Sequence, residues 1–185
     1  MESLVTLDDY TEQVVKICPN GTIGDIIELG GLFIGLPKVP KRGIQGEGVE
    51  TDLQMWGRVP MPKELSRLRG MDEWSEAPKE FREKFHPYIE EEFRRRREGL
   101  WFYNKGEATY ITGRHYMLLQ WTKIDIGYPS YLAFQRDIFI HMAACESDPR
   151  CIGQLYTKCR RSGYTNICSS VLLDEATQVK DKLLG

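Results

Sequence analysis

The chain has 185 residues, which is enough for one domain with an N-terminal extension, and 41% hydrophobic and 28% charged residues are typical of a folded protein. Its 25 basic and 27 acidic side chains give a formal net charge of -2, which excludes a histone-like protein that binds nucleic acid through overall positive charge. No apolar run approaches the roughly 20 residues of a membrane span, and the acidic N-terminal segment is unlike a signal peptide, so we expect a cytosolic protein without a membrane partner.

The first 75 residues predict an irregular arm with short helices. Thr6, followed by an acidic residue at Asp9, predicts the N-cap of a helix over residues 7–17. A short apolar stretch follows at Ile23–Leu29. Residues 30–62 hold eleven of the glycines and prolines, so we expect no hydrophobic core within that stretch.

A long charged helix is predicted over residues 76–98. Each glutamate of Glu90–Glu92 stands four residues before an arginine of Arg94–Arg97, the favoured order for helical ion pairs. This spacing favours a self-neutralised, solvated helix face over a nucleic-acid contact.

The remaining elements follow the change from charged to apolar and aromatic sequence. We predict a hairpin over residues 100–111, a short helix from Thr112-Gly113 to Trp121, an extended piece at 124–127, a helix from Tyr131 to about Cys145 capped by Ser130, a buried strand at Cys151–Thr157, a loop at 158–163 and a helix from Tyr164 to Lys182. A parallel sheet cannot be completed after a single core strand, so we expect the chain to be part of a longer protein.

The segment Cys151–Thr165 has the strand, polar loop and helix order that a phosphate-binding loop requires. Backbone N–H groups of such a loop and the helix N-terminus present positive potential to phosphate oxygens. Gly163 allows close approach of the backbone, and Thr165 stands where a hydroxyl would ligate Mg²⁺.

The match to the GxxxxGK[ST] pattern is partial. Lys158 stands in place of the first glycine and Tyr164 in place of the lysine. Three cations at the front of the loop, Lys158, Arg160 and Arg161, offer the missing charge. A basic strand-to-helix turn on the surface is the alternative interpretation.

The stretch Val171–Glu175 looks like a Walker B strand, in which apolar residues precede an Asp-Glu pair. It begins only six residues after Thr165, whereas a parallel strand needs a crossover of a dozen or more residues. We therefore place Asp174 and Glu175 on the solvent face of the last helix, with Leu172 and Leu173 toward the sheet.

A second motif, Phe134-Gln135-Arg136, precedes the phosphate loop by one helix and one strand. Together with residues 107–116 and 121–129, it makes the sequence resemble the large terminase subunit of tailed bacteriophages, especially that of crAss-like phages. That family carries an aromatic-Gln-Arg motif before a deviant phosphate loop whose cation comes from an early Lys or Arg. The resemblance covers roughly residues 100–183.

The resemblance implies a role for each matched residue. Gln135 would recognise adenine by paired hydrogen bonds, and Phe134 or Tyr131 would pack near the base. Arg160 would be the catalytic cation on the β- and γ-phosphates, with Arg161 and Lys158 as its alternates. The remaining nucleotide-binding residues would be Ser162, Gly163, Tyr164 and Thr165, the last also holding Mg²⁺ through its hydroxyl.

The implied fold class is α/β, the start of a P-loop NTPase domain of the ASCE type after a mainly helical, irregular N-terminal region. Residues 1–75 would be the arm and residues 76–185 the first part of the ATPase domain. The Walker B acid and the catalytic glutamate would then lie outside the segment, so an ATPase activity would belong to the full-length protein.

The implied function is that of a genome-packaging motor, which couples ATP hydrolysis to translocation of double-stranded DNA into a procapsid. ATP and Mg²⁺ would be its cofactors. Its partners would be double-stranded DNA, the portal protein, the small terminase subunit and further copies of itself in a ring. It would act in the host cytoplasm, transiently on the viral procapsid.

Two functions of other classes stay open. One is a nucleic-acid-binding module that uses arginine clusters on phosphates and stacks bases on Trp101, Tyr103 and Trp121. The other is a structural virion-assembly protein whose Gly/Pro-rich arm wraps a neighbour. Nucleotide dependence separates the motor from both.

Overall fold

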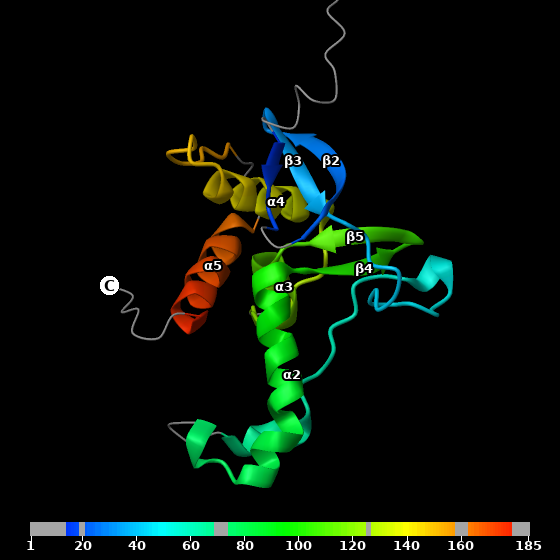
Figure 1. Cartoon of the computed structure of the whole chain (residues 1–185), viewed down its shortest axis with the longest axis vertical. Coiled ribbons are helices and arrows are strands. Elements are labelled where there is room, and N and C mark those ends of the chain that lie inside the picture. The colour runs from blue at the N-terminus through cyan, green and yellow to red at the C-terminus, as the bar shows by residue number, and fades with distance from the viewer. Residues whose placement is uncertain (1–13, 19–20, 69–73, 125–126, 158–162, 179–185) are drawn as a thin grey trace, which may run out of the picture.

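The computed structural model describes residues 14–18, 21–68, 74–124, 127–157 and 163–178, and these combine helices with two small sheets (Figure 1). The expected α/β class is confirmed at this level. In chain order the elements are β1 (Val14–Lys16), β2 (Ile23–Leu29), β3 (Leu32–Pro37), three 3-10 turns (Thr51–Leu53, Lys63–Leu68 and Trp74–Glu76), α2 (Lys79–Glu98), β4 (Leu100–Asn104), β5 (Glu107–Ile111), α3 (Gly113–Gln120), α4 (Ala133–Ser147) and α5 (Tyr164–Gln178).

The N-terminal sheet has the strand order β1-β3-β2, with β1 parallel and β2 antiparallel to the central β3. Gly30 and Gly31, with φ of 59° and 79°, form the tight turn between β2 and β3, a left-handed geometry that favours glycine. Ile34 and Leu36 of β3 are buried in a core cluster that also includes Ile140 of α4. This sheet therefore packs against α4 (Figure 1).

Two expectations for the N-terminal region are wrong. Residues 14–16 form β1 instead of the end of a helix over 7–17, because the β-branched Val14 and Val15 pair with β3; residues 7–13 lie outside the described part. Residues 32–37 form β3, although we expected no core in 30–62. The many glycines and prolines indicated an irregular stretch, but the few apolar residues between them are enough for a short core strand.

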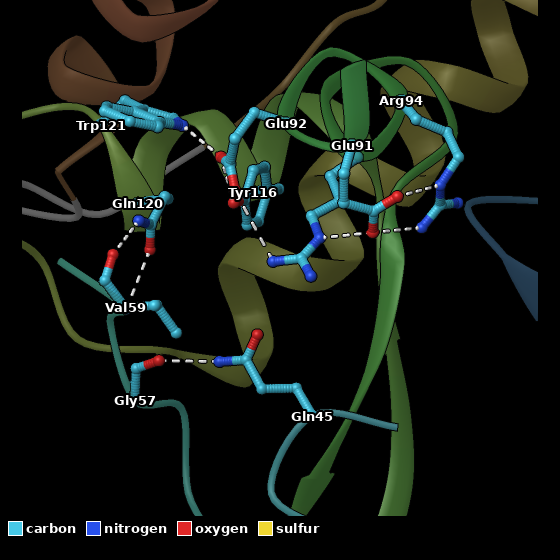
Figure 2. Close-up of polar contacts among 10 residues, drawn as sticks. Gln45, Gly57, Val59, Glu91, Glu92, Arg94, Tyr116, Gln120 and Trp121 are labelled. Atoms are coloured by element: carbon cyan, nitrogen blue, oxygen red, sulfur yellow. Dashed lines mark hydrogen bonds and ion pairs between the residues drawn. The ribbon is translucent and has the colours of Figure 1, made fainter. Parts of the chain in front are cut away.

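Residues 43–59 run along the β4–β5 hairpin and are fixed there by glutamine side chains (Figure 2). Gln45 forms a bridge with Phe102 of β4, and its Nε2 donates to the Gly57 carbonyl at 2.7 Å. Gln120 both donates to the Val59 carbonyl and accepts from its N–H, as a neighbouring strand would. Side-chain amides thus supplement the backbone hydrogen bonds that Gln45 makes with β4.

Helix α2 confirms the predicted charged helix and projects from the body of the molecule (Figure 1). It begins after Pro78 and ends at Gly99, where a Cβ would lie 2.2 Å from the Ile111 carbonyl oxygen. Glu91 pairs with Arg95 at 2.8 Å, as expected, and also with Arg94 at 2.7 Å. The hydrogen bond from Arg94, above all, lowers the pKa of Glu91 to about 2.

Glu92 does not pair with the arginine four residues on, because it is buried. Its Oε2 accepts hydrogen bonds from the Tyr116 hydroxyl at 2.6 Å and from Trp121 Nε1 at 3.1 Å (Figure 2). A buried carboxylate is tolerated only with such partners. This contact fastens α2 to α3.

The predicted hairpin is confirmed by β4 and β5, whose turn residues Lys105 and Gly106 both have positive φ. The short helix α3 follows, with the Thr112 hydroxyl accepting from the His115 N–H at 3.4 Å. Helix α3 is almost wholly buried and contacts α2, α4 and α5. It is the centre around which the helices pack.

Helices α4 and α5 correspond to the two last predicted helices. Helix α4 begins after Leu132, whose side chain makes no capping bond, so the predicted cap at Ser130 is wrong. Helix α5 begins at Tyr164, as expected, and residues 179–182 lie outside the described part. Among the helices of the described ranges, none combines the length and the apolar character needed to cross a bilayer.

The predicted buried strand at Cys151–Thr157 is wrong. The segment has no regular secondary structure, and Ile152 and Leu155 are almost fully exposed, at 106% and 96% of their reference areas. Its apolar residues gave the pattern of a core strand, but a strand forms only where a neighbour satisfies its backbone groups. The described residues place no strand beside it.

The expected solvent position of Asp174 is also wrong. Asp174 is 1% exposed, and its carboxylate binds Arg96 of α2 at 2.6 Å. Leu172 and Leu173, expected to face a sheet, are 55% and 46% exposed. Asp174 shares the inward face of α5 with the buried Ile167, and the apolar pattern gave no sign of its partner Arg96 on α2.

Candidate functional site

The start of α5 is shaped by Gly163. Its φ of 73° lies in the left-handed region, and its carbonyl accepts from the N–H groups of Asn166 at 3.0 Å and Ile167 at 3.2 Å. The first N–H groups of a helix have no acceptor within the helix, so the start of α5 offers donors to an anion. Thr165, in the first turn, is exposed, which leaves its hydroxyl accessible to a metal ion.

Gln135 of α4 lies directly against this helix start. A Cβ placed on Gly163 would be 3.5 Å from Gln135 Nε2, so two positions 28 residues apart in sequence meet in space. Gln135 is 6% exposed, and its buried Oε1 has no hydrogen-bond partner among the described residues. An unpaired buried carbonyl oxygen costs about 1–3 kcal/mol. The helix pattern alone allowed an exposed glutamine here, and burial removes that interpretation.

Phe134 precedes Gln135 and points elsewhere. It is 44% exposed and lines a cleft of about 410 Å³ between α4, the β2–β3 turn and residues 154–156. Tyr156, on the far wall, stacks on Tyr164 with ring centroids 5.1 Å apart and planes 10° apart. This stack joins the cleft to the start of α5.

Tyr131, the other residue expected near a base, is partly buried and packs against the core. Its ring stacks on His115 at 5.8 Å and meets Phe102 edge-on at 5.0 Å. His115 is sandwiched between Tyr131 and Phe139, and neither of its ring nitrogens has a partner in the described residues. Burial, with the nearby charge of Arg136 as a second cause, lowers the pKa of His115 to about 3.

The predicted loop cations lie outside the described residues. This holds for the catalytic candidate Arg160 and for Lys158, Arg161 and Ser162. Their roles stay predictions from the sequence. Of the predicted site, the structure brings together Gln135, Gly163 and Tyr164, with Thr165 on the next position of the same helix.

The arginines that a nucleic-acid-binding module would use are mostly engaged in ion pairs. Arg94 and Arg95 bind glutamates of α2, and Arg150 binds Asp148 at 2.7 Å. Arg96 binds Asp174 and is only 11% exposed. Arginines neutralised in this way offer little net charge to a phosphate backbone.

The aromatic residues proposed for base stacking are likewise used internally. Trp101 is buried and packs on Tyr110, with ring centroids 5.5 Å apart. Trp121 donates to Glu92, and Tyr103 packs against the core cluster beneath the N-terminal sheet. These contacts disfavour the stacking platform that a single-strand-binding protein needs.

A second cleft, of about 400 Å³, lies between α2, α3, α4 and α5. Its charges are balanced: Arg96 pairs with Asp174, and Arg114 pairs with Glu146 and, at 2.8 Å, with Glu175. These pairs tie α5 to α2 and α3. We interpret this cleft as a structural junction.

Sequence reasoning missed the polar residues of the first cleft. Asp137 and His141 follow Phe134 at spacings of three and seven residues, which puts all three on one face of α4. Gln154 faces them from the segment after the helix. That spacing was the available signal, but polar and apolar residues mixed on one helix face do not by themselves indicate a binding site.

Comparisons with known proteins add no relative: no family model, no curated protein and no solved structure matches the chain.

Proposed function

We propose that the chain is the ATP-binding N-terminal portion of a viral genome-packaging motor of the large terminase type. One observation carries the proposal: Gln135 lies against Gly163 at the start of α5. The sequence pattern assigns phosphate binding to the loop that ends at Gly163, and the family resemblance assigns base recognition to Gln135; one nucleotide site would need both. Their proximity supports a common site.

The chemistry of the described residues fits ATP with Mg²⁺. The N–H groups of Tyr164 and Thr165, which precede the first hydrogen bonds of α5, suit phosphate oxygens, and the exposed Thr165 hydroxyl suits a hard cation. The Gln135 carboxamide, whose buried Oε1 has no hydrogen-bond partner among the described residues, has the acceptor and the donor that pair with the amino group and a ring nitrogen of adenine. Arg160, with Lys158 and Arg161 as alternates, would supply the cation that lowers the barrier to phosphoryl transfer.

The wider role rests on the sequence resemblance. Translocation of double-stranded DNA into a procapsid, with the portal protein, the small terminase subunit and a homo-oligomeric ring, would be the work of the full-length protein in the host cytoplasm. The ion-paired arginines weigh against a module that binds nucleic acid through this segment alone. We therefore place nucleotide binding first.

Calorimetric titration with ATP, GTP and inorganic triphosphate, each with Mg²⁺, tests the proposal. We expect ATP to bind more tightly than GTP, and Gln135→Ala to remove that preference, about 1–3 kcal/mol by the arithmetic of paired base contacts, while triphosphate still binds. Gly163→Ala should weaken all three ligands, because its φ of 73° strains any L-residue.

Gly153→Ala is the matched glycine control, because a Cβ there meets no atom within 4 Å and no left-handed φ is required. Its affinities should equal those of the wild type. Equal affinity of the wild type for ATP and GTP would remove Gln135 from base recognition. Absence of binding to both ATP and triphosphate would contradict the proposed function.

A further inference from the structure

We propose that Cys145 and Cys151 are a thiol pair that oxidises to a reversible disulfide between the end of α4 and the segment that follows it. The five cysteines of the chain form no CxxC motif, so the sequence does not show that two of them meet. In the structure, the Cys145 and Cys151 thiols are hydrogen-bonded to each other. Two cysteines can be bridged without backbone movement only when their side chains point toward each other, and this contact meets that condition.

A tight turn after α4 brings the two cysteines together. The Asp148 N–H donates to the Ala144 carbonyl at 3.0 Å, and the Cys151 N–H donates to the Asp148 carbonyl at 3.0 Å. The Asp148 carboxylate also accepts from the backbone N–H of Arg150 at 3.0 Å and from its guanidinium at 2.7 Å. The chain therefore turns back at once and returns Cys151 to the last turn of α4, where Cys145 lies.

The surroundings of the pair assign a role to each group. Both thiols are half-buried, so a small oxidant in solution can reach them. Burial, above all, and the contact with Cys151 raise the pKa of Cys145, so we assign the first attack on the oxidant to Cys151. His141 Nδ1 lies 3.6 Å from Cys145 Sγ and 2.7 Å from Gln154 Nε2. An amide nitrogen only donates, so Nδ1 is an acceptor and can take the Cys145 proton in the second step.

A metal site is the other use of neighbouring sulfur and imidazole groups. Zinc, which binds both kinds of ligand, takes three or four of them from the protein. Among the residues that the structure describes, no three His, Cys, Asp or Glu side chains are arranged to hold a metal ion. The described donors therefore favour oxidation of the pair over metal binding.

The reaction balances with a small disulfide, such as oxidised glutathione, as the oxidant. The Cys151 thiolate attacks one glutathione sulfur, so a mixed disulfide forms and one glutathione thiolate leaves. Cys145 then attacks the sulfur of Cys151, and the second glutathione thiolate leaves as its bond breaks. The protein loses two electrons and two protons, and two glutathione thiols are formed. An excess of a dithiol such as dithiothreitol reverses both steps.

The new bond would tie the start of segment 151–157 to α4. Within this segment, Gln154, Leu155 and Tyr156 line the cleft of about 410 Å³ beside α4. No regular secondary structure holds the segment in place. The disulfide would therefore fix one end of the cleft wall to α4.

The test is incubation of the purified chain with oxidised glutathione, alkylation of the remaining thiols and tryptic mapping. Trypsin cuts after Arg150 and Lys158, so the peptides that carry Cys145, Cys151 and Cys159 are separate. We expect the first two peptides to be joined and two of the five thiols to be lost. An intramolecular thiol acts at an effective concentration of about 1 mM or more, so at about 0.1 mM glutathione the mixed disulfide should stay below about a tenth of the joined product.

Serine variants separate the two steps. Cys145→Ser should stop the reaction at the mixed disulfide on Cys151, whereas Cys151→Ser should leave Cys145 unmodified over the same time. Cys168→Ser, at another half-buried cysteine, is the matched control and should give the wild-type yield of joined peptides. His141→Gln should slow ring closure, so that the mixed disulfide accumulates.

The map of the joined peptides decides the outcome. Absence of a bond between Cys145 and Cys151, or a bond from Cys151 to Cys159 in its place, would overturn the proposal. Unchanged closure in His141→Gln would remove the role of the imidazole as proton acceptor. None of these measurements uses ATP, so the thiol pair and the proposed function are tested separately.

Discussion

The helical core and the segment after α4 differ in how their side chains make contacts within the protein. In the core, α2 and α3 bury polar groups only with partners, as Glu92 does with Tyr116 and Trp121. In the segment after α4, Ile152 and Leu155 stand in solvent. The difference indicates that contacts within the helical core stabilise its fold, whereas Ile152 and Leu155 leave nearly all of their apolar surface in water.

The largest effect is expected where α5 is joined to α2, at the Arg96–Asp174 pair. Arg96→Ala should lower the free energy of unfolding by about 3–5 kcal/mol, because it leaves the Asp174 carboxylate buried without its arginine. Urea unfolding followed by circular dichroism measures the loss.

Arg97→Ala, at the exposed neighbouring position, is the control and should change stability by less than about 0.5 kcal/mol. Arg96→Met combined with Asp174→Leu should recover most of the loss, since both charges are then removed together. An equal effect of the two arginine substitutions would show that the pair does not fasten α5.

A medium effect is expected within the core, at His115. Its pKa in the folded state, about 3, is lower than the ordinary 6.5 of the unfolded chain, so the unfolded state binds the extra proton between these values. The free energy of unfolding is therefore unaffected by this group well above pH 6.5. It decreases as the pH falls below that value, by about 2 kcal/mol at pH 5.

His115→Phe keeps an aromatic ring between Tyr131 and Phe139 and removes the titration. Unfolding curves at pH 7 and pH 5 should then show a smaller acid loss for the variant than for the wild type. Identical losses in both proteins would mean that His115 is protonated in the folded state.

The smallest effect is expected in the exposed segment. Ile152→Ser and Leu155→Ser should each change the free energy of unfolding by less than about 0.5 kcal/mol, because both side chains already contact water. Ile167→Ala is the contrast, since Ile167 is 0% exposed and its truncation should cost about 2–5 kcal/mol. A loss above about 1 kcal/mol at Leu155 would show that the segment packs in solution.

The candidate site illustrates what could and could not be predicted for function. The sequence motifs pointed to Gln135 and Gly163, and the fold places them together. The sequence gave no hint of Asp137 or Gln154, because their significance depends on a cleft formed by α4, the β2–β3 turn and a segment that begins seven residues after the end of α4. A site made by three distant segments leaves no local pattern.

The sequence by itself determined the elements whose signals are local: the charged helix α2, the β4–β5 hairpin and the helix that begins after Gly163. Periodicity, turn residues and i,i+4 charges act within a few residues, so they can be read directly. Only the tertiary structure decided that residues 14–16 pair as a strand, that Cys151–Thr157 does not, and that Asp174 turns inward to Arg96. Each of these depends on a partner far along the chain, whose presence or absence no local pattern records.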